Sequence, residues 1–249
     1  MEVSSFGLCG SKLSLYQFFP FYALFFSNDE STSVRFNFYR GSDYAIEYLK
    51  GNLPGATPDP RLSSIYEETA TLGFVGHVQG ADGDNSPAEL SAIGSGLVIG
   101  SSQNGIIMTA AESFFMQAEA QLYSKISGND TASFGAGVQS SLDYHGAGTF
   151  GVSYNPTSPG LAYVGSNDDK LQAIMRQKWI ATNGINAAES YIEYTRTGYP
   201  AGIPLALTAQ RADRPKRLLY PSSELTSNAS NVPAVSSDQA FITGPFWAQ

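Results

Sequence analysis

The strongest constraint on the fold is a pair of helical patterns between residues 168 and 200. In the first pattern, apolar residues recur at the spacing of one buried stripe: Leu171, Ile174, Met175, Trp179 and Ile180. Asn167 or Asp168 is expected to cap the start of this helix. Asn183–Gly184 should end it, because a glycine after the last periodic residue adopts the left-handed turn that closes a helix.

The second pattern predicts a shorter helix that returns along the first. Asn186, followed three residues later by Glu189, is an Asx variant of the capping box that begins many helices. Gly198 and Pro200 should end this helix. The predicted apolar stripe consists of Ala188, Tyr191, Ile192 and Thr195. Together the two patterns predict a helical hairpin with the large apolar and aromatic residues of both arms in the core.

A second helical pair is predicted upstream, over residues 109–123 and 132–144. Thr109 and Glu112 form a capping-box pattern at the start of the first helix. The apolar faces consist of Ala111, Phe115, Ala118 and Leu122 on the first helix and Phe134, Val138, Ser141 and Leu142 on the second. A glycine in a helix costs about 1 kcal/mol relative to alanine. We therefore expect the second helix, with its two glycines at 135 and 137, to be frayed or packed closely at its start.

Before residue 73 the patterns are shorter. Aromatic-rich runs at 18–26 and 34–39 predict strands or extended segments. Ser42 or Asp43 should begin a helix that ends at Gly51. The sequence PDPRL that follows predicts a proline turn, for which a structural role is sufficient.

Residues 73–105 are rich in Gly, Asp, Asn and Ser and have no helical period. Asp82, Asp84 and Asn85 place oxygen ligands on a glycine turn, which is the pattern of a calcium loop. An EF-hand needs a glutamate at loop position 12, where this chain has Ile93, although Glu89 could complete an irregular site. We therefore expect a solvated loop and no metal. If calcium were bound, its candidate ligands would be Asp82, Asp84 and Asn85.

Composition excludes several functional classes. Only 14% of residues are charged, and the net charge is -8 with a pI near 4.7. Nucleic-acid binding needs clustered Lys and Arg, so no nucleic-acid partner is expected. The basic run Arg211–Arg217 is interpreted as a loop that supports the helices. Cys9 is the single cysteine, which excludes an intrachain disulfide and a thiolate zinc site.

No catalytic constellation stands out. The two histidines, His77 and His145, lie in glycine-rich contexts without the spacing of a metal-binding helix or a nucleophile elbow. A pair of carboxylates for glycoside hydrolysis is assembled in space, so the sequence leaves that possibility open. Glu112, Glu119 and Glu189 are interpreted as a cap, a solvated helix position and a cap. We predict no catalytic residue and no cofactor.

Three stretches of the chain resemble the SusD/RagB family. They are QKWIATNGINAAESYIEYTRTGYP followed by RPKRLLYPSSELTSNASNV, the helix MTAAESFFMQAEAQ, and YLK followed by DPRL. The resemblance implies a mostly α, tetratricopeptide-related SusD-like fold with long loops and a few short strands. It implies that residues 16–249 form the C-terminal portion of a SusD-like domain, whereas residues 1–15 match nothing in the family.

The same resemblance implies a non-catalytic nutrient-binding lipoprotein of the outer membrane, exposed at the cell surface. Its expected partners are an oligosaccharide or peptide ligand and a SusC-like TonB-dependent transporter, which it covers as a lid. The resemblance also implies a lipid anchor in the full-length protein. No signal-peptide pattern precedes Cys9, so this cysteine is not expected to carry it. A secreted glycoside hydrolase and a structural lid without a ligand site of its own are the alternatives.

The candidate ligand-binding residues are Tyr194, Arg196 and Tyr199, at the RTGYP turn. They combine ring faces and hydrogen-bond donors, which suit sugars. We favour a structural role for them, with Arg196 bonding loop carbonyls. Arg217 and Glu224 are expected to pair or cap in the same way.

Overall fold

The computed structural model describes residues 39–54, 56–81, 86–98 and 105–244. Its helices, in chain order, are α2 (Asp43–Lys50), α3 (Leu62–Ile65), η2 (Pro87–Glu89), α4 (Ala110–Leu122), α5 (Asp130–Tyr144), α6 (Asn167–Thr182), α7 (Ala187–Thr197), α8 (Ser222–Ser227), η3 (Ala229–Asn231) and α9 (Gln239–Ile242). In these ranges β structure is limited to isolated bridges. The predicted mostly α fold with long loops is confirmed. The predicted extended runs at 18–26 and 34–39 lie outside the described residues, except Tyr39.

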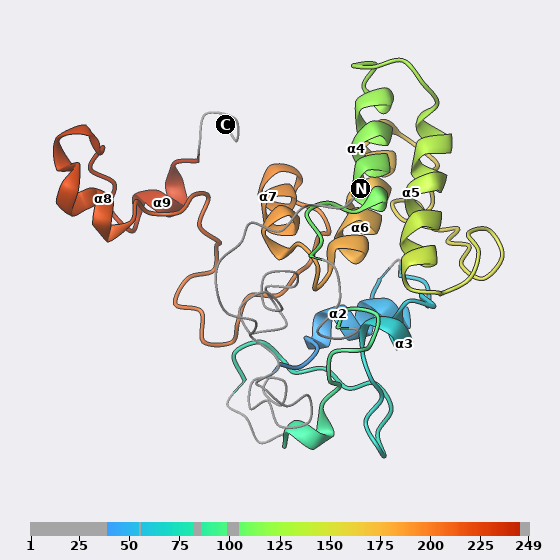
Figure 1. The fold of residues 1–249 in the computed structure, drawn as a ribbon. Coiled ribbons are helices and arrows are strands. Elements are labelled where there is room, and N and C mark those ends of the chain that lie inside the picture. Colours follow the sequence, from blue (N-terminus) through green and yellow to red (C-terminus); the bar gives the residue numbers. More distant parts are fainter. Residues whose placement is uncertain (1–38, 55, 82–85, 99–104, 245–249) are drawn as a thin grey trace, which may run out of the picture.

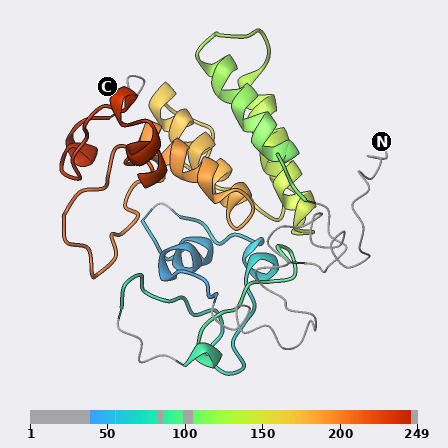
Figure 2. The same ribbon diagram turned by 60° about the vertical axis from the view of Figure 1, so that its left-hand side comes forward.

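The α4–α5 pair was predicted almost to the residue. Figures 1 and 2 show the two helices side by side, with α6 against them. The Thr109 side chain accepts a hydrogen bond from the Glu112 backbone N–H at 3.1 Å, as expected of a cap. Asn129 caps α5 by accepting from the Ala132 N–H at 3.0 Å, so α5 begins two residues before the predicted start. Phe115 and Phe134 are buried between the helices with their rings 6.0 Å apart.

The glycines of α5 lie in different surroundings, which explains the close approach of the two helices. A Cβ added to Gly137 would lie 2.7 Å from a ring carbon of Phe115. A Cβ added to Gly135 would be 3.7 Å from the nearest ring carbon of Phe150, which is ordinary contact. Gly137 therefore lets α4 pack on α5, whereas Gly135 is not required for packing.

We expect Gly137→Ala to destabilise the fold and Gly135→Ala to stabilise it. Both changes gain about 1 kcal/mol of helix propensity. At residue 137 the clash with Phe115 overpacks the core, which costs about 1–3 kcal/mol, so the net change is a loss of up to about 2 kcal/mol. Urea denaturation followed by circular dichroism measures both variants. Equal effects of the two substitutions would contradict the assigned packing.

Helix α6 is shared by two hydrophobic cores. Ser166 caps it rather than Asn167 or Asp168, and Ser166 forms a reciprocal capping box with Asp169. The residues of α6 that join the core of α4 and α5 are Ala173, Ile174, Met175 and Ala181. Ile180 instead joins the core formed with α2 and α3. The first predicted stripe was therefore correct in its position, but it serves two cores and not one.

The α6–α7 hairpin is confirmed, but its second arm packs differently from the prediction. Asn186 precedes α7 without a side-chain capping bond, so the predicted capping box does not form. Tyr191 and Ile192, predicted as core, are 43% and 45% exposed. The contacts between the arms are polar: the Thr182 and Ser190 hydroxyls lie 2.6 Å apart. Since polar contacts fix α7 on α6, its apolar stripe is free to face outward.

Arg61 joins the PDPRL turn to two helices and has no exposed surface. Its guanidinium binds both carboxylate oxygens of Asp59, at 2.9 and 2.6 Å. It also donates to Ser141 on α5 and to Gln177 on α6, each at 2.8 Å. The same group lies over the ring of Tyr154, which accepts a hydrogen bond from Gln177. The structural role predicted for the turn thus extends to the whole helical scaffold.

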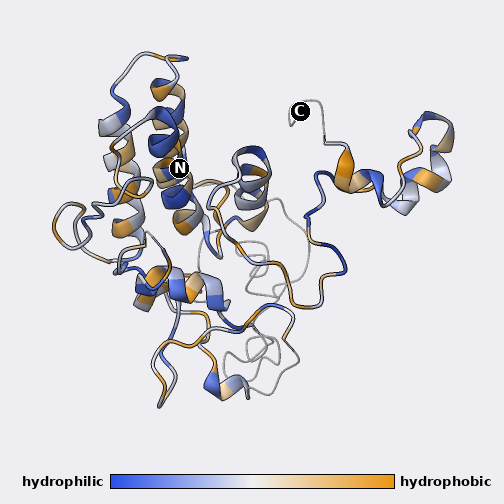
Figure 3. Ribbon diagram, turned by 180° about the vertical axis from the view of Figure 1, so that it is seen from behind, coloured by the Kyte–Doolittle hydropathy of each residue, from blue (hydrophilic) through white to orange (hydrophobic). Residues whose placement is uncertain are grey.

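The C-terminal segment with α8 and α9 lies apart from the helical body in Figure 1. Leu218 and Leu219 on this segment are 80% and 48% exposed. Figure 3 shows that α9 is largely hydrophobic, and within it Ala240 is buried whereas Ile242 is 68% exposed. In the described ranges no helix has both the length and the apolar character to cross a membrane.

Candidate functional site

A pocket of ≈ 220 Å³ lies between the end of α6, α7 and the loop that follows α7. We call it the α7 pocket. It is lined by Trp179, Asn183, Gly184, Ala187, Ser190, Tyr191, Tyr194, Ile203 and Arg214. Its wall therefore combines an indole, two phenol rings, an amide and a guanidinium, which is the set of groups that holds a sugar by its faces and its hydroxyls.

The Trp179 ring packs against two tyrosines of helix α2. It meets the rings of Tyr44 and Tyr48 edge-on, at centroid distances of 5.8 and 5.3 Å. The predicted core position of Trp179 is only partly correct, because the ring is half-buried against the α2–α3 core and also lines the α7 pocket. The indole face is thus fixed before any ligand arrives.

Arg214 clamps the loop after α7 onto the pocket. One guanidinium nitrogen donates to the Tyr194 hydroxyl at 3.0 Å, and the other donates to the carbonyls of Ile203 and Pro204 at 3.0 and 2.6 Å. The guanidinium also lies over the Tyr194 ring, 5.2 Å from its centroid. The loop-carbonyl contacts expected of Arg196 are therefore made by Arg214. Arg214 belongs to the basic run Arg211–Arg217, which was predicted to support the helices.

Arg196 belongs to a chain of charges that joins three helices. It binds both carboxylate oxygens of Glu119 on α4, at 2.7 and 2.8 Å, and Glu193 on α7 at 2.6 Å. Glu193 in turn accepts from the buried Lys178 on α6 at 2.6 Å. Burial opposes charge on Glu193, but the bonds from Lys178 and Arg196 hold its pKa below the ordinary value. The expected loop-carbonyl role of Arg196 and the solvated position of Glu119 were both wrong.

Of the three predicted ligand residues, the structure places one in the α7 pocket. Tyr194 lines it, whereas Arg196 and Tyr199 are not among its lining residues. The Tyr199 hydroxyl donates to the Asp168 carboxylate at 2.9 Å, which raises the pKa of that phenol and ties the RTGYP turn to the start of α6. The structural roles favoured for Arg196 and Tyr199 agree with these contacts, and their part in ligand binding stays a prediction.

The calcium candidates Asp82, Asp84 and Asn85 lie outside the described residues. Glu89, which was considered as a further ligand of that site, accepts from the Ser86 backbone N–H at 2.9 Å and so completes the capping box of η2. In the part of the chain that the structure describes, no three His, Cys, Asp or Glu side chains converge as metal ligands.

The expected pair of Arg217 and Glu224 does not form. Arg217 lies over the ring of Tyr220, with a long contact to the Leu218 carbonyl. Glu224 accepts from the Asn228 amide at 3.0 Å. Arg217 and Glu224 each contact residues close to them in the sequence and do not contact each other.

The sequence analysis placed the pocket residues Trp179 and Tyr191 in the core and gave Asn183 and Arg214 no ligand role. Asn183 was interpreted only as a helix end, yet its amide donates to the Tyr66 hydroxyl at 3.1 Å and it also faces the pocket. Arg214 was one of several cations in a basic run. Neither had a local signal, because their partners are distant in the sequence.

The comparisons with known proteins agree on one family. The model of SusD-like proteins, described as starch-binding and associating with the outer membrane, matches residues 24–221. A SusD homologue from Bacteroides thetaiotaomicron is 25% identical, with a TM-score of 0.58 over 76% of this chain and 45% of that one. A SusD homologue from Bacteroides uniformis is 23% identical, with a TM-score of 0.64 over 84% and 49% of the two chains.

A candidate nutrient-binding protein of the outer membrane from Bacteroides vulgatus shares the fold, with 18% identity and a TM-score of 0.59 over 91% of this chain and 56% of that one. The chain thus spans about half the length of the structures that it matches. A search of curated proteins gave no significant match. Since the family model covers most of the sequence and the helices superpose on those of SusD homologues, this chain belongs to the SusD-like family.

Proposed function

We propose that this chain is the ligand-binding part of a non-catalytic nutrient-binding protein of the outer membrane, and that the α7 pocket binds a neutral oligosaccharide. In the full-length protein, a lipid anchor holds it at the cell surface. It passes its ligand to a SusC-like TonB-dependent transporter, for which it serves as a lid. The observation that carries the proposal is the grouping of Trp179, Tyr191 and Tyr194 with Asn183 and Arg214 around one pocket.

The arrangement of polar groups supports sugar binding. Arg214 uses three of its contacts for Tyr194 and the two loop carbonyls, and a guanidinium carries five N–H donors. Two donors thus stay available to sugar hydroxyls at a fixed position. Because the ring of Trp179 and the clamp of Arg214 are both preformed, little conformational entropy is lost on binding.

The lining of the pocket favours binding over cleavage. Glycoside hydrolysis generally uses two carboxylates that flank the scissile bond. None of the described residues that line the α7 pocket is an aspartate or glutamate. A sugar bound there would meet aromatic faces and hydrogen-bond donors, without a general acid or a nucleophile.

We expect Tyr191→Ala to weaken binding of a neutral glycan, such as a soluble α-glucan, by about 5–10-fold. This corresponds to roughly 1–1.4 kcal/mol, the contribution of one aromatic face. Because the Tyr191 side chain is exposed, the melting temperature should change little. Affinity electrophoresis over a panel of neutral polysaccharides, followed by calorimetry on the best ligand, measures the change.

The matched control is Tyr123→Ala, which removes an exposed tyrosine at the far end of α4. This variant should bind like the wild type. Release of reducing ends from the same polysaccharides would replace the proposal with a glycoside hydrolase. Binding of none of the panel, in a protein that still captures the transporter, would favour the structural lid.

A further inference from the structure

A second pocket, of ≈ 480 Å³, lies between α2, α6 and the loop after α7. We call it the α2 pocket. It is lined by Asp43, Tyr44, Tyr48, Leu53, Pro54, Arg176, Ala201, Gly202 and Pro204. Its volume is within the range of about 300–1,000 Å³ that small-molecule sites occupy. The neighbours Ile203 and Pro204 line the α7 pocket and the α2 pocket respectively, so the two pockets are adjacent.

Two polar atoms in the wall of the α2 pocket are buried without a partner. They are the Tyr48 hydroxyl and the Nε of Arg176, neither of which has a hydrogen bond within the described part of the chain. Tyr48 is only 4% exposed. Buried polar groups in native proteins are nearly always paired, because leaving one unpaired costs its full desolvation penalty. Two unpaired donors at one pocket therefore point to an acceptor outside the described residues, which a bound ligand would supply.

The positive charge of Arg176 indicates that the acceptor is an anion. Arg61, Arg196 and Arg211 each form an ion pair with a carboxylate, whereas Arg176 has none among the described residues. Burial raises the pKa of the Tyr48 phenol, so the hydroxyl stays protonated and able to donate. A planar guanidinium beside a second donor is the arrangement that suits a carboxylate, which accepts two parallel bonds.

The remaining wall suits a sugar ring. Tyr44 supplies a phenol ring, and Leu53 and Pro54 supply apolar surface. The Tyr44 hydroxyl donates to the Ala201 carbonyl at 3.1 Å, which fixes the loop across the pocket. Asp43 lines the same pocket without an ion pair to Arg176, and its carboxylate is an acceptor for ring hydroxyls.

We propose that the α2 pocket binds a sugar unit that carries a carboxylate, a hexuronic acid, with Arg176 on the carboxylate and the Tyr48 hydroxyl donating to the same ligand. This inference rests on the proposed saccharide-binding function and makes it more specific. The protein then holds a mixed oligosaccharide at two adjacent places, with a neutral unit in the α7 pocket and the acidic unit in the α2 pocket.

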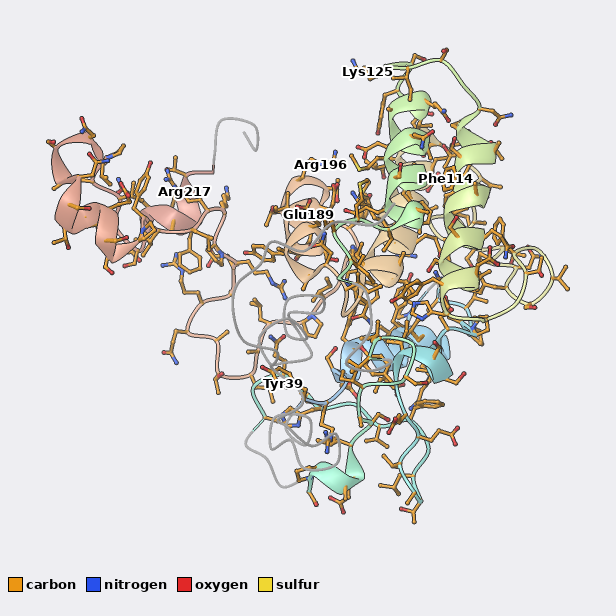
Figure 4. All side chains as sticks on the ribbon, viewed as in Figure 1. Tyr39, Phe114, Lys125, Glu189, Arg196 and Arg217 are labelled. Atoms are coloured by element: carbon orange, nitrogen blue, oxygen red, sulfur yellow. The ribbon has the colours of Figure 1, made fainter. Side chains whose placement is uncertain are left out.

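The test compares a digalacturonate with the corresponding neutral digalactoside by calorimetry on the whole chain. We expect Arg176→Gln to weaken binding of the acidic disaccharide by about 30-fold and to leave the neutral one unchanged, because only the charge-assisted bonds are lost. The matched control is Arg217→Gln, which removes the same charge. Figure 4 shows Arg217 on the C-terminal segment, far from α2 and α6. Unchanged affinity of Arg176→Gln for the digalacturonate would overturn the inference.

Tyr48→Phe separates a binding role from a structural one. The hydroxyl has no hydrogen-bond partner among the described residues, so its removal should leave the melting temperature equal or higher while binding of the digalacturonate falls about 5-fold. A lowered melting temperature with unchanged binding would show a structural hydroxyl and overturn its assigned role.

Two further measurements distinguish the outcomes. Competition by an acidic dipeptide as strong as that by the digalacturonate would overturn the sugar assignment. In one outcome, Tyr191→Ala weakens binding of neutral glycans but Arg176→Gln leaves the affinity for the digalacturonate unchanged. Only the inference on the α2 pocket then fails. If neither class of saccharide binds, the proposed function itself fails.

Discussion

Arg61→Ala is expected to lower the free energy of unfolding by about 3–5 kcal/mol, which is the usual effect of removing one partner of a buried ion pair. The substitution leaves the Asp59 carboxylate without its counter-ion in a site that is closed to water. It also leaves the acceptors on Ser141 and Gln177 unpaired. For a chain of this size, the loss corresponds to a fall in melting temperature of roughly 6–20 °C.

Differential scanning calorimetry measures this change, and Arg217→Ala serves as the control. Arg217 is an arginine on the C-terminal segment that has a ring contact but no ion pair among the described residues. Its removal should shift the melting temperature by only 1–2 °C or less, as about 0.5 kcal/mol implies for a surface site. A similar shift for both variants would mean that the Arg61 network does not hold the two cores together.

The second large effect is a loss of stability as the pH falls from 6.5 to 4, caused by His145. This residue, at the end of α5, is 9% exposed, and its Nδ1 lies 3.1 Å from the Ser64 hydroxyl. Burial, together with the nearby Arg61 charge, lowers the pKa of His145 to about 4, and Asp59 only partly offsets this. As the pH falls, the His145 imidazole is therefore protonated near pH 6.5 in the unfolded chain but only near pH 4 in the folded chain.

The sign follows from the proton balance. Where the unfolded state binds more protons, stability rises with pH, so the contribution of His145 is complete above pH 6.5 and is lost towards pH 4. At about 1.4 kcal/mol for each pH unit, the loss over this window is about 2–4 kcal/mol. Urea denaturation at several pH values should show a shallower pH dependence in His145→Gln than in the wild type. A titration of the imidazole in the folded protein near pH 6.5 would contradict the assigned burial.

The helices could be predicted because their signals are local. A capping residue, a periodic stripe and a glycine at the end are all contained in one stretch, and α2 and α4 follow them closely. The cap of α6 was misplaced by one residue, because Ser166, Asn167 and Asp168 are all suitable caps and only the backbone conformation selects one. The family could also be recognised from such local stretches.

Apart from Tyr194, the candidate site and the network that supports it could not be predicted, because they depend on contacts between distant parts of the chain. Arg61 meets Ser141 and Gln177, which are 80 and 116 residues away. The outward stripe of α7 has the same apolar spacing as a buried one, and only the polar contacts to α6 decide its orientation. Arg176 appears in the sequence as an ordinary helix surface residue, and its unpaired Nε becomes visible only beside Tyr48.

The position of α6 between two cores limits how the family can diverge. A substitution on this helix can disturb the packing of both hydrophobic cores, so few replacements there are compatible with folding. The exposed aromatic side of α7 and the loop after it touch fewer neighbours and can accumulate mutations at little energetic cost. Substitutions at exposed α7 positions such as Tyr191 should therefore reshape the α7 pocket while leaving the folded scaffold intact.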